Sequence, residues 1–333
     1  MKQYAVVLLL AAAVMCSCHG KQGTGSNDSD TIELAQCPTF CEDSAMQSIY
    51  TQCAFGPRVT GTEAHRLCGD YIVETFKRYG CTVTEQTAEL TAYNGQKLPG
   101  RNIIASVNPD NMDRILICAH WDCRPWADND PDEKNHKTPI LAANDAASGV
   151  AVMLELARQI QSLQLNFGVD FICFDAEDWG TPQWDEENYP DSHDSWCLGS
   201  TYWATNPHKE NYEARYGILL DMVGGRGSKF AQESYSLYYA PTVVQMLWHL
   251  ASQIGYGAFF LMEEGGGVVD DHVPVNQIAN IPCIDIIPHF ENGPSSFGPT
   301  WHTVADTPEN IDPAVLKAVG QSVLQLIYND NLK

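Results

Sequence analysis

The run Val169–Phe174, followed at once by Asp175-Ala176-Glu177-Asp178, most limits what this chain can fold into. The run is short, mostly apolar and bounded by polar residues, which is typical of a buried strand. Two adjacent carboxylates at the end of such a strand repel each other unless a cation holds one of them. The pair therefore predicts a metal ligand beside a second carboxylate that stays free to move protons.

Helical segments alternate with apolar strands along the rest of the chain. We predict helices at residues 43–54, 62–79, 146–163, 241–254 and 312–328, and strands at 101–107, 114–119, 169–174, 216–220 and 281–287. This alternation predicts one α/β domain, residues 36–333, with a mostly parallel or mixed twisted sheet and helices on both faces. In such sheets the functional site lies beyond the carboxyl ends of the strands.

The first 35 residues are not part of this fold. Lys2 and the apolar stretch Val6–Met15, too short to span a membrane, indicate a signal peptide over residues 1–18. Its end, Met15-Cys16-Ser17-Cys18, resembles the bacterial lipoprotein box, with Cys18 favoured over Cys16 because the small Ser17 precedes it; cleavage without a lipid is the alternative. Residues 19–35 are expected to form a flexible tether. We therefore expect an exported, periplasmic protein that is anchored to the membrane only through a lipid on Cys18.

The charge of the chain excludes some partners. A formal net charge of −23 argues against nucleic acid and against anionic membrane surfaces. It suits a substrate with a positive amine, although it also simply favours solubility. The chain holds 12 cysteines, many for an exported protein, but no CxxC pair, so a structural zinc knuckle is not expected and the disulfide pairing stays open.

Acidic and histidine residues gather at the predicted strand ends. His120 and Asp122 follow one strand, Glu177 and Asp178 a second and Asp221 a third, while Asp145 precedes a helix and His302 lies in a long loop. Catalytic zinc takes three protein ligands of imidazole nitrogen and carboxylate oxygen, and Asp145, Asp178 and His302 supply such a set. Taken singly, Asp145 could be a helix N-cap, and Asp178 and His302 could be ordinary surface residues.

Six motifs in this order carry a family resemblance. They are His120-Trp-Asp122, the segment 143–149 (Ala-Asn-Asp-Ala-Ala-Ser-Gly), Asp175-Ala-Glu-Asp178, Asp221, the segment 270–274 (Asp-Asp-His-Val-Pro) and Trp301-His302-Thr303. From about residue 37 onward the chain resembles the animal-type (type II) glutaminyl-peptide cyclotransferases, which share the fold of the zinc aminopeptidases. With its leader it looks like a bacterial, Bacteroidetes-like lipoprotein member of that family.

The resemblance implies two possible metal arrangements. In the aminopeptidases two zinc ions are bound by residues matching His120, Asp145, Asp178, Asp221 and His302, and the residue matching Glu177 is the general base. In the cyclotransferases one zinc is held by residues matching Asp145, Asp178 and His302, which makes His120 a vestigial second-metal position. All five positions are present in this sequence, so the ligand count leaves both open.

The segment around Asp270 favours the cyclotransferases. Peptidases usually have Ser-Asp-His where this chain has Asp270-Asp271-His272, and the additional carboxylate matches a residue that shares hydrogen bonds with those matching Glu177 and Asp221. Trp301 and Phe297 match aromatic residues of the substrate pocket, with Phe290 as a competitor for the position of Phe297. The chain departs from the animal enzymes at Asp178, where they have glutamate.

A second pocket tryptophan of the family has no clear match. The segment between Asp178 and Cys197 holds Trp179, Trp184 and Trp196, of which we predict Trp184.

The resemblance thus implies a zinc enzyme with one Zn²⁺ per chain that converts the N-terminal glutamine of peptides or exported proteins into pyroglutamate and releases ammonia. Glu177 would shuttle the proton, Asp221 and Asp270 would orient the amide, and the chain would act as a monomer. Two alternatives remain. One is a two-zinc aminopeptidase that releases N-terminal residues. The other is a catalytically silent binding protein of the same fold.

Overall fold

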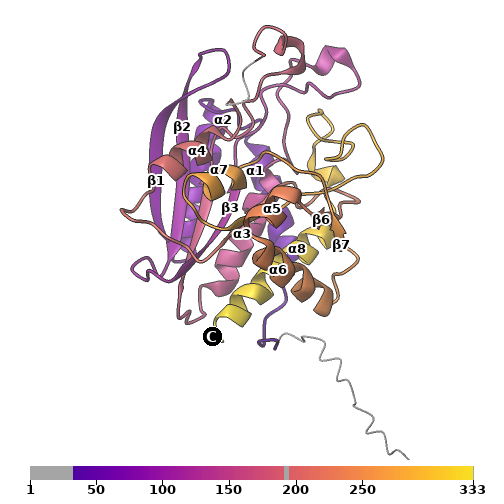
Figure 1. Cartoon of the computed structure of the whole chain (residues 1–333). Helices are drawn as coiled ribbons and strands as arrows, with labels where there is room; N and C mark the ends of the chain where they lie inside the picture. Colours follow the sequence, from indigo (N-terminus) through magenta and orange to yellow (C-terminus); the bar gives the residue numbers. More distant parts are fainter. Residues whose placement is uncertain (1–32, 191–194, 333) are drawn as a thin grey trace, which may run out of the picture. The chain divides into compact units, whose positions relative to one another are not determined.

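A six-stranded mixed sheet runs through the residues that the computed structural model describes, 33–190 and 195–332 (Figure 1). The strand order is β1-β2-β4-β3-β5-β8. The strands are β1 (Thr82–Thr91), β2 (Lys97–Val107), β3 (Arg114–His120), β4 (Gly168–Phe174), β5 (Gly217–Leu220) and β8 (Cys283–Ile286). The last four run parallel to one another, whereas β2 is antiparallel to β4 and β1 to β2. The predicted α/β fold with a mixed sheet is confirmed.

Both faces of the sheet are buried because successive side chains of a strand point to opposite sides. Along β3, Ile115 and Ile117 belong to a large apolar core, whereas Leu116 and Cys118 belong to a smaller one. Five helices supply residues to the large core: α1 (Glu42–Ala54), α2 (Glu63–Arg78), α3 (Ala147–Ile160), α6 (Pro241–Gln253) and α8 (Pro313–Asp330). Two supply residues to the smaller core: α4 (Leu198–Thr205) and α7 (His272–Gln277).

Several elements were not predicted. They are β1, the three short helices α4, α5 (Ser234–Tyr239) and α7, and a separate parallel pair, β6 (Phe230–Gln232) with β7 (Phe260–Glu264). Strand β1 buries only Leu90 among its ten residues, so its sequence lacks the apolar alternation that marks a half-buried strand. The expected strand at 281–287 is shorter in the structure, where β8 spans Cys283–Ile286.

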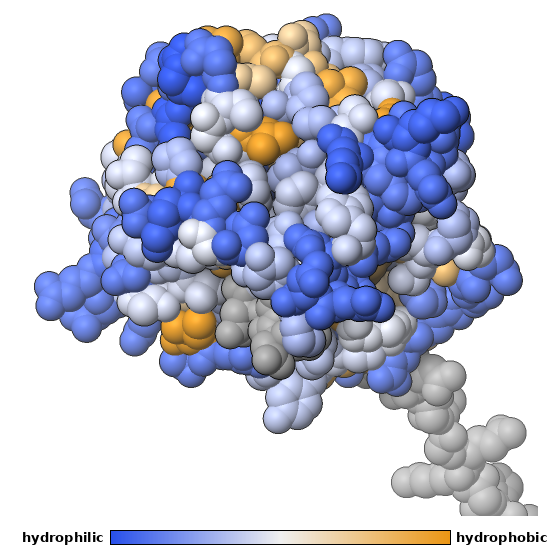
Figure 2. Space-filling view, turned by 90° about the horizontal axis from the view of Figure 1, so that it is seen from above, coloured by the Kyte–Doolittle hydropathy of each residue, from blue (hydrophilic) through white to orange (hydrophobic). Residues whose placement is uncertain are grey.

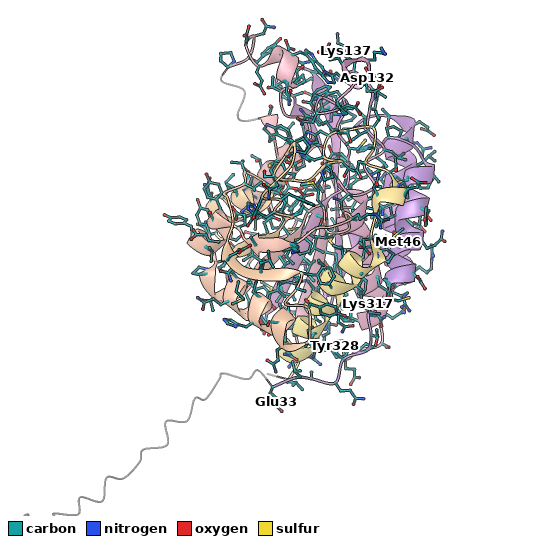
Figure 3. All side chains as sticks on the ribbon, turned by 90° about the vertical axis from the view of Figure 1, so that its right-hand side faces the viewer. Glu33, Met46, Asp132, Lys137, Lys317 and Tyr328 are labelled. Carbon is teal, nitrogen blue, oxygen red and sulfur yellow. The ribbon has the colours of Figure 1, made fainter. Side chains whose placement is uncertain are left out.

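The first described residues pack against the closing helix. The Ala35 amide donates to Asn329 of α8 (2.9 Å), and Gln325 donates back to the Ala35 carbonyl (2.8 Å). In Figure 3, Glu33 accordingly lies beside Tyr328, at the opposite end from the loop that carries Asp132 and Lys137. The predicted leader, Cys18 and the tether up to residue 32 lie outside the described residues. None of the described helices is long and apolar enough to cross a membrane.

Cysteines of the described part are all free thiols. The ten from Cys37 to Cys283 include eight that are buried, among them Cys173 in β4, which was expected to be a buried thiol. The question of disulfide pairing is answered for these ten: the structure pairs none of them.

A buried ion pair joins β3 to β4. The guanidinium of Arg114 donates two hydrogen bonds to the Asp170 carboxylate (2.5 and 2.6 Å), which also accepts from Ser106 (2.5 Å) and Tyr212 (2.6 Å). Asp170 is fully buried. Burial alone would raise the pKa of Asp170, but the hydrogen bonds from Arg114 and its charge hold that pKa below its usual value. The carboxylate is therefore charged and fully compensated inside the sheet.

We predict that Asp170→Asn lowers the free energy of unfolding by about 3–5 kcal/mol at neutral pH, because it leaves Arg114 buried without its partner. Since the pKa of Asp170 is lower in the folded chain, its contribution is complete above the unfolded value of about 3.9 and is lost as the pH falls through the folded value. Urea unfolding at several pH values measures both effects. Asp113→Asn, which removes a carboxylate from an exposed ion pair with Arg215, is the control; an equal loss in both variants would contradict the prediction.

Candidate active site

Residues from several strand ends converge on one pocket. Because β3, β4 and β5 are parallel, their carboxyl ends meet at one edge of the sheet, and the residues that follow them lie close together. The pocket has a volume of about 480 Å³. It is lined by Asp145, Glu177, Asp178, Trp196, Asp221, Met222, Gly267, Val268, Val269, Asp270, Ile287, Phe297, Trp301 and His302. Figure 2 looks onto this end of the molecule, where hydrophilic residues predominate and apolar ones are scattered.

A larger groove elsewhere has a different character. It measures about 670 Å³ and lies between α2 and the strands β1 and β2. Its cationic side chains Arg66, Lys97 and Arg101 each pair with a nearby carboxylate. The pocket at the strand ends is lined by Asp178 and Asp270, each with a buried carboxylate oxygen that has no hydrogen-bond partner among the described residues, and it is therefore the candidate active site.

The structure brings Asp145, Asp178 and His302 together. One ligand atom from each lies within 4.8 Å of the other two, and all three residues are buried. The His302 Nε2 atom is 3.2 Å from Asp178 Oδ1, so aspartate at this position reaches the cluster although it is shorter than glutamate. The second oxygen of Asp178 has no hydrogen-bond partner among the described residues. A buried carboxylate oxygen that lacks a partner, next to an imidazole nitrogen, fits a zinc ion.

Two further aspartates hold the segments that carry these ligands. Asp306 accepts hydrogen bonds from the amides of Asn144 (2.7 Å) and Asp145 (3.0 Å). Asp122 accepts from the amides of Glu177 (3.1 Å) and Asp178 (3.3 Å). Asp122 stood out in the sequence as part of its motif, but Asp306 has no sequence signal beyond its closeness to His302.

His120 lies between two carboxylates. Its Nε2 atom is 2.9 Å from Asp145 and 3.2 Å from Asp221, and the three residues could also hold an ion together. Burial alone would lower the pKa of His120, but hydrogen bonds to Asp122, Asp145 and Asp221 raise that pKa well above its usual value. An imidazole that is protonated here would place positive charge between Asp145 and Asp221.

Glu177, Asp221 and Asp270 form the acidic part of the pocket. Burial is the largest cause that raises the pKa of all three, and like charges add to it. The pKa of Asp270 rises to about 7 and that of Asp221 to about 6, while that of Glu177 lies well above its usual range. Asp270 can therefore carry a proton near neutral pH and donate a hydrogen bond, which a charged carboxylate cannot do.

Aromatic rings form one wall of the pocket. Trp301 stacks on the candidate ligand His302 (centroids 3.9 Å apart), and Phe297 lies against Trp301 (4.7 Å). Trp196 runs parallel to His302 at 6.1 Å. Phe290 lines a separate small cavity instead. The structure thus places Trp301 and Phe297 in the pocket, as the sequence suggested.

The prediction that Trp184 lines the pocket is wrong. This tryptophan lies in a short exposed turn, is itself 41% exposed, and packs on Trp126 outside the pocket. Trp196 takes the predicted place because the chain returns to the site only just before α4. There the amides of Cys197 and Leu198 bond to the carbonyls of Glu177 (3.0 Å) and Ala176 (3.2 Å). No feature of the sequence predicts this backbone pairing.

Sequence reasoning also missed a buried cation, Arg124. Its guanidinium binds both oxygens of Asp128 (2.6 Å each), lies 3.3 Å from Asp178 Oδ1 and covers the ring of Trp196 at 4.7 Å. Asp128 Oδ1 is in turn 3.5 Å from the Nδ1 atom of His302. Arg124 therefore supports two of the three candidate zinc ligands and a wall of the pocket. Its only sequence signal is its place two residues after the His120-Trp-Asp122 motif.

Comparison with solved structures identifies similar folds. The glutaminyl cyclase of Bacteroides thetaiotaomicron bound to N-acetylhistamine is 50% identical, with a TM-score of 0.86 over 88% of this chain and 99% of that one. A chain described as a leucine aminopeptidase precursor from the same organism is 49% identical, with a TM-score of 0.85 over 89% of this chain and 99% of that one.

Sequence comparison identifies the same two groups. The model of peptidase family M28 matches residues 102–327. The glutaminyl-peptide cyclotransferase of Gloydius blomhoffii is 27% identical over 69% of this chain and 65% of its own length. The aminopeptidase YwaD of Bacillus subtilis is 27% identical over 82% of this chain and 53% of its own length, so the chain spans about half of that relative. The resemblance to the cyclotransferases is confirmed.

We predict that Asp128→Asn weakens zinc binding about 10–100-fold, because the carboxylate that faces the other ring nitrogen of a ligand histidine fixes that ring and raises its basicity. Competition with a chelator of known affinity measures the change. Asp132→Asn, an exposed position in the same loop, is the matched control. Equal zinc affinities in the two variants would show that Asp128 does not support His302.

Proposed function

The chain belongs to peptidase family M28, and we propose that it acts as a zinc-dependent glutaminyl-peptide cyclotransferase. It converts the N-terminal glutamine of a peptide into pyroglutamate and releases ammonia. The observation that carries this proposal is the position of Asp270, which shares a buried cluster with Glu177 inside a pocket walled by aromatic rings. The 50% identity to a bacterial glutaminyl cyclase over most of both chains supports it.

The reaction joins two groups of the same residue. The α-amine of the N-terminal glutamine attacks the carbon of its own γ-amide, the ring closes, and the γ-nitrogen leaves as ammonia. A proton must therefore leave the attacking amine and reach the departing nitrogen. Both groups must also be held close together in one conformation of the side chain.

One zinc ion fits the cluster of Asp145, Asp178 and His302. When bound, it polarises the γ-carbonyl oxygen and stabilises the negative charge that develops there. Asp145 and Asp178 neutralise the charge of the ion, while Asp128 orients the ring of His302. With an ion held beside Asp178, the carboxylate form of the adjacent Glu177, which burial disfavours, would be favoured.

Glu177 is placed to carry the proton. It lines the pocket, and its carboxyl group, with a raised pKa, accepts a proton from the attacking amine and returns it to the leaving nitrogen. Asp270 and Asp221 line the same pocket and orient the scissile amide through hydrogen bonds. Because the pKa of Asp270 is raised to about 7, its carboxyl group can gain or lose a proton near neutral pH. It can therefore either donate or accept a hydrogen bond.

The aromatic wall decides which nucleophile attacks. Trp196, Phe297 and Trp301 line the pocket, and a substrate bound against these rings would displace water from it, so the internal amine would meet no competing nucleophile. A hydrolase must admit water to the same position. This wall is therefore what separates the proposed reaction from peptide hydrolysis.

A second candidate is a two-zinc aminopeptidase. The ligand atoms of His120, Asp145 and Asp221 lie close enough to hold another ion, which favours that activity. Against it, Asp270 stands beside Asp221, and the imidazole of His120 already supplies positive charge between Asp145 and Asp221. We therefore favour one zinc ion per chain.

The cellular setting is part of the proposal. The leader over residues 1–18 supports export, and Cys18 supports attachment to a membrane through a lipid on the periplasmic side. The substrates would then be exported peptides and proteins that begin with glutamine. The excess of 42 acidic over 19 basic residues opposes binding to nucleic acid. We propose that the chain acts as a monomer.

We predict that Glu177→Gln lowers the rate of cyclisation by about 10²–10⁴-fold, because it removes the proton carrier without changing the size of the side chain. The variant should keep one zinc ion per chain, as the unaltered protein does, since Glu177 is not a ligand. A coupled assay for ammonia and metal analysis check the two parts. Glu186→Gln, an exposed glutamate in the same segment, is the control. Full activity of Glu177→Gln would disprove the assigned role.

A further inference from the structure

Cys197 forms a cluster of possible metal ligands with Glu177 and Asp270. One donor atom from each of the three lies within 4.8 Å of the other two, and all three residues are buried. The Cys197 thiol donates a hydrogen bond to the Oε1 atom of Glu177, with the sulfur and oxygen 3.4 Å apart. The three zinc ligands described above belong to a different group of atoms, so this cluster is separate from them.

The backbone fixes the thiol in this position. Cys197 has a φ of +55°, an uncommon conformation for a residue other than glycine, and sits directly before α4. The Cys197 amide donates a hydrogen bond to the carbonyl of Glu177, and the Leu198 amide donates one to the carbonyl of Ala176. These two hydrogen bonds hold the segment before α4 against the segment that follows β4. The local backbone therefore directs the sulfur toward the Glu177 carboxyl group. The position of the sulfur does not depend on the side-chain rotamer alone.

Asp270 presents an oxygen that lacks a partner. Its Oδ1 accepts from the amide of Asp271 (2.5 Å), but its Oδ2, although buried, has no hydrogen-bond partner among the described residues. Glu177 and Asp270 both line the pocket, so an ion can reach them from solvent. Asp221 and Asp271 are two further buried carboxyl groups nearby. An orphaned buried oxygen among acids favours a cation.

The spacing of the donors suits a tetrahedral ion. Zinc binds thiolate sulfur at about 2.3 Å and carboxylate oxygen at about 2.0 Å, which places two such ligands about 3.5 Å apart in a tetrahedron. The observed separation between Cys197 sulfur and Glu177 oxygen is 3.4 Å. A thiolate is a soft ligand and favours thiophilic ions such as Zn²⁺ over Mg²⁺ or Ca²⁺, which prefer oxygen ligands.

We propose that Cys197, Glu177 and Asp270 form a second, inhibitory site for a thiophilic divalent cation such as Zn²⁺ or Cd²⁺ in excess. The ion displaces the thiol proton of Cys197 and any proton on Glu177 or Asp270, these protons pass to solvent, and the ion is bound by the resulting thiolate and two carboxylates. Glu177 can no longer accept a proton from the substrate while it is a ligand. The inhibitory effect rests on the proposed function, whereas the binding itself does not.

Cadmium distinguishes this site from the others because cadmium bound to thiolate absorbs in the near ultraviolet. Neither the Asp145–Asp178–His302 group nor the His120–Asp145–Asp221 group contains sulfur. Adding Cd²⁺ to the zinc-loaded protein should give this absorption, saturating at one equivalent. The absorption should vanish in Cys197→Ser and persist in Cys41→Ser, a partly exposed cysteine, and in His120→Gln.

Asp270→Asn provides a test that keeps the thiol. It should weaken cadmium binding at least about tenfold, since even loss of a group that only supports a ligand costs that much. Cadmium should also inhibit cyclisation by the unaltered protein over the same concentration range as the absorption appears. Absorption that survives in Cys197→Ser, or none in the unaltered protein, would overturn the site. Absorption without inhibition in a protein that makes pyroglutamate would overturn its inhibitory role alone.

Discussion

The active-site end of this protein depends on compensation of buried negative charge. Asp145, Glu177, Asp178, Asp221 and Asp270 all lie in one pocket with almost no exposure to water. Like charges at such distances in a medium of low polarity are strongly unfavourable unless cations balance them or protons neutralise them. The chain provides the buried cation Arg124, the imidazole of His120 with its raised pKa, carboxyl groups with raised pKa values, and one set of ligands that fits zinc. The residues that compensate this charge lie at the end of a strand or in a loop that follows a strand end.

This arrangement also explains how one ligand framework serves two reactions. The M28 relatives include a glutaminyl cyclase and an aminopeptidase, and the five ligand positions of a two-zinc site are all present in this chain. The difference lies around them. Asp270 places an additional acid beside Glu177, and the rings of Trp196, Phe297 and Trp301 line the pocket. We propose that a metal-assisted attack on a carbonyl group then proceeds with the amine of the substrate as the nucleophile.

Sequence reasoning recovers the central strands and brings the candidate metal ligands to one place for a simple physical reason. A buried parallel strand must be apolar, its carboxyl end must lie at one edge of the sheet, and polar residues placed there must converge. The same reasoning fails where tertiary contacts decide. Trp196 reaches the pocket only because the backbone around Cys197 pairs with that of Ala176 and Glu177. Arg124 supports Asp178 across a loop, and β1 is too exposed to show an apolar pattern.

The central claim is that an internal amine, and not water, attacks the substrate. Mass spectrometry of a glutamine-initiated peptide after incubation with the purified, zinc-loaded protein tests this most directly. The account predicts that the peptide loses the mass of ammonia and keeps all its residues. Release of free glutamine, with a peptide one residue shorter, would contradict it and establish an aminopeptidase.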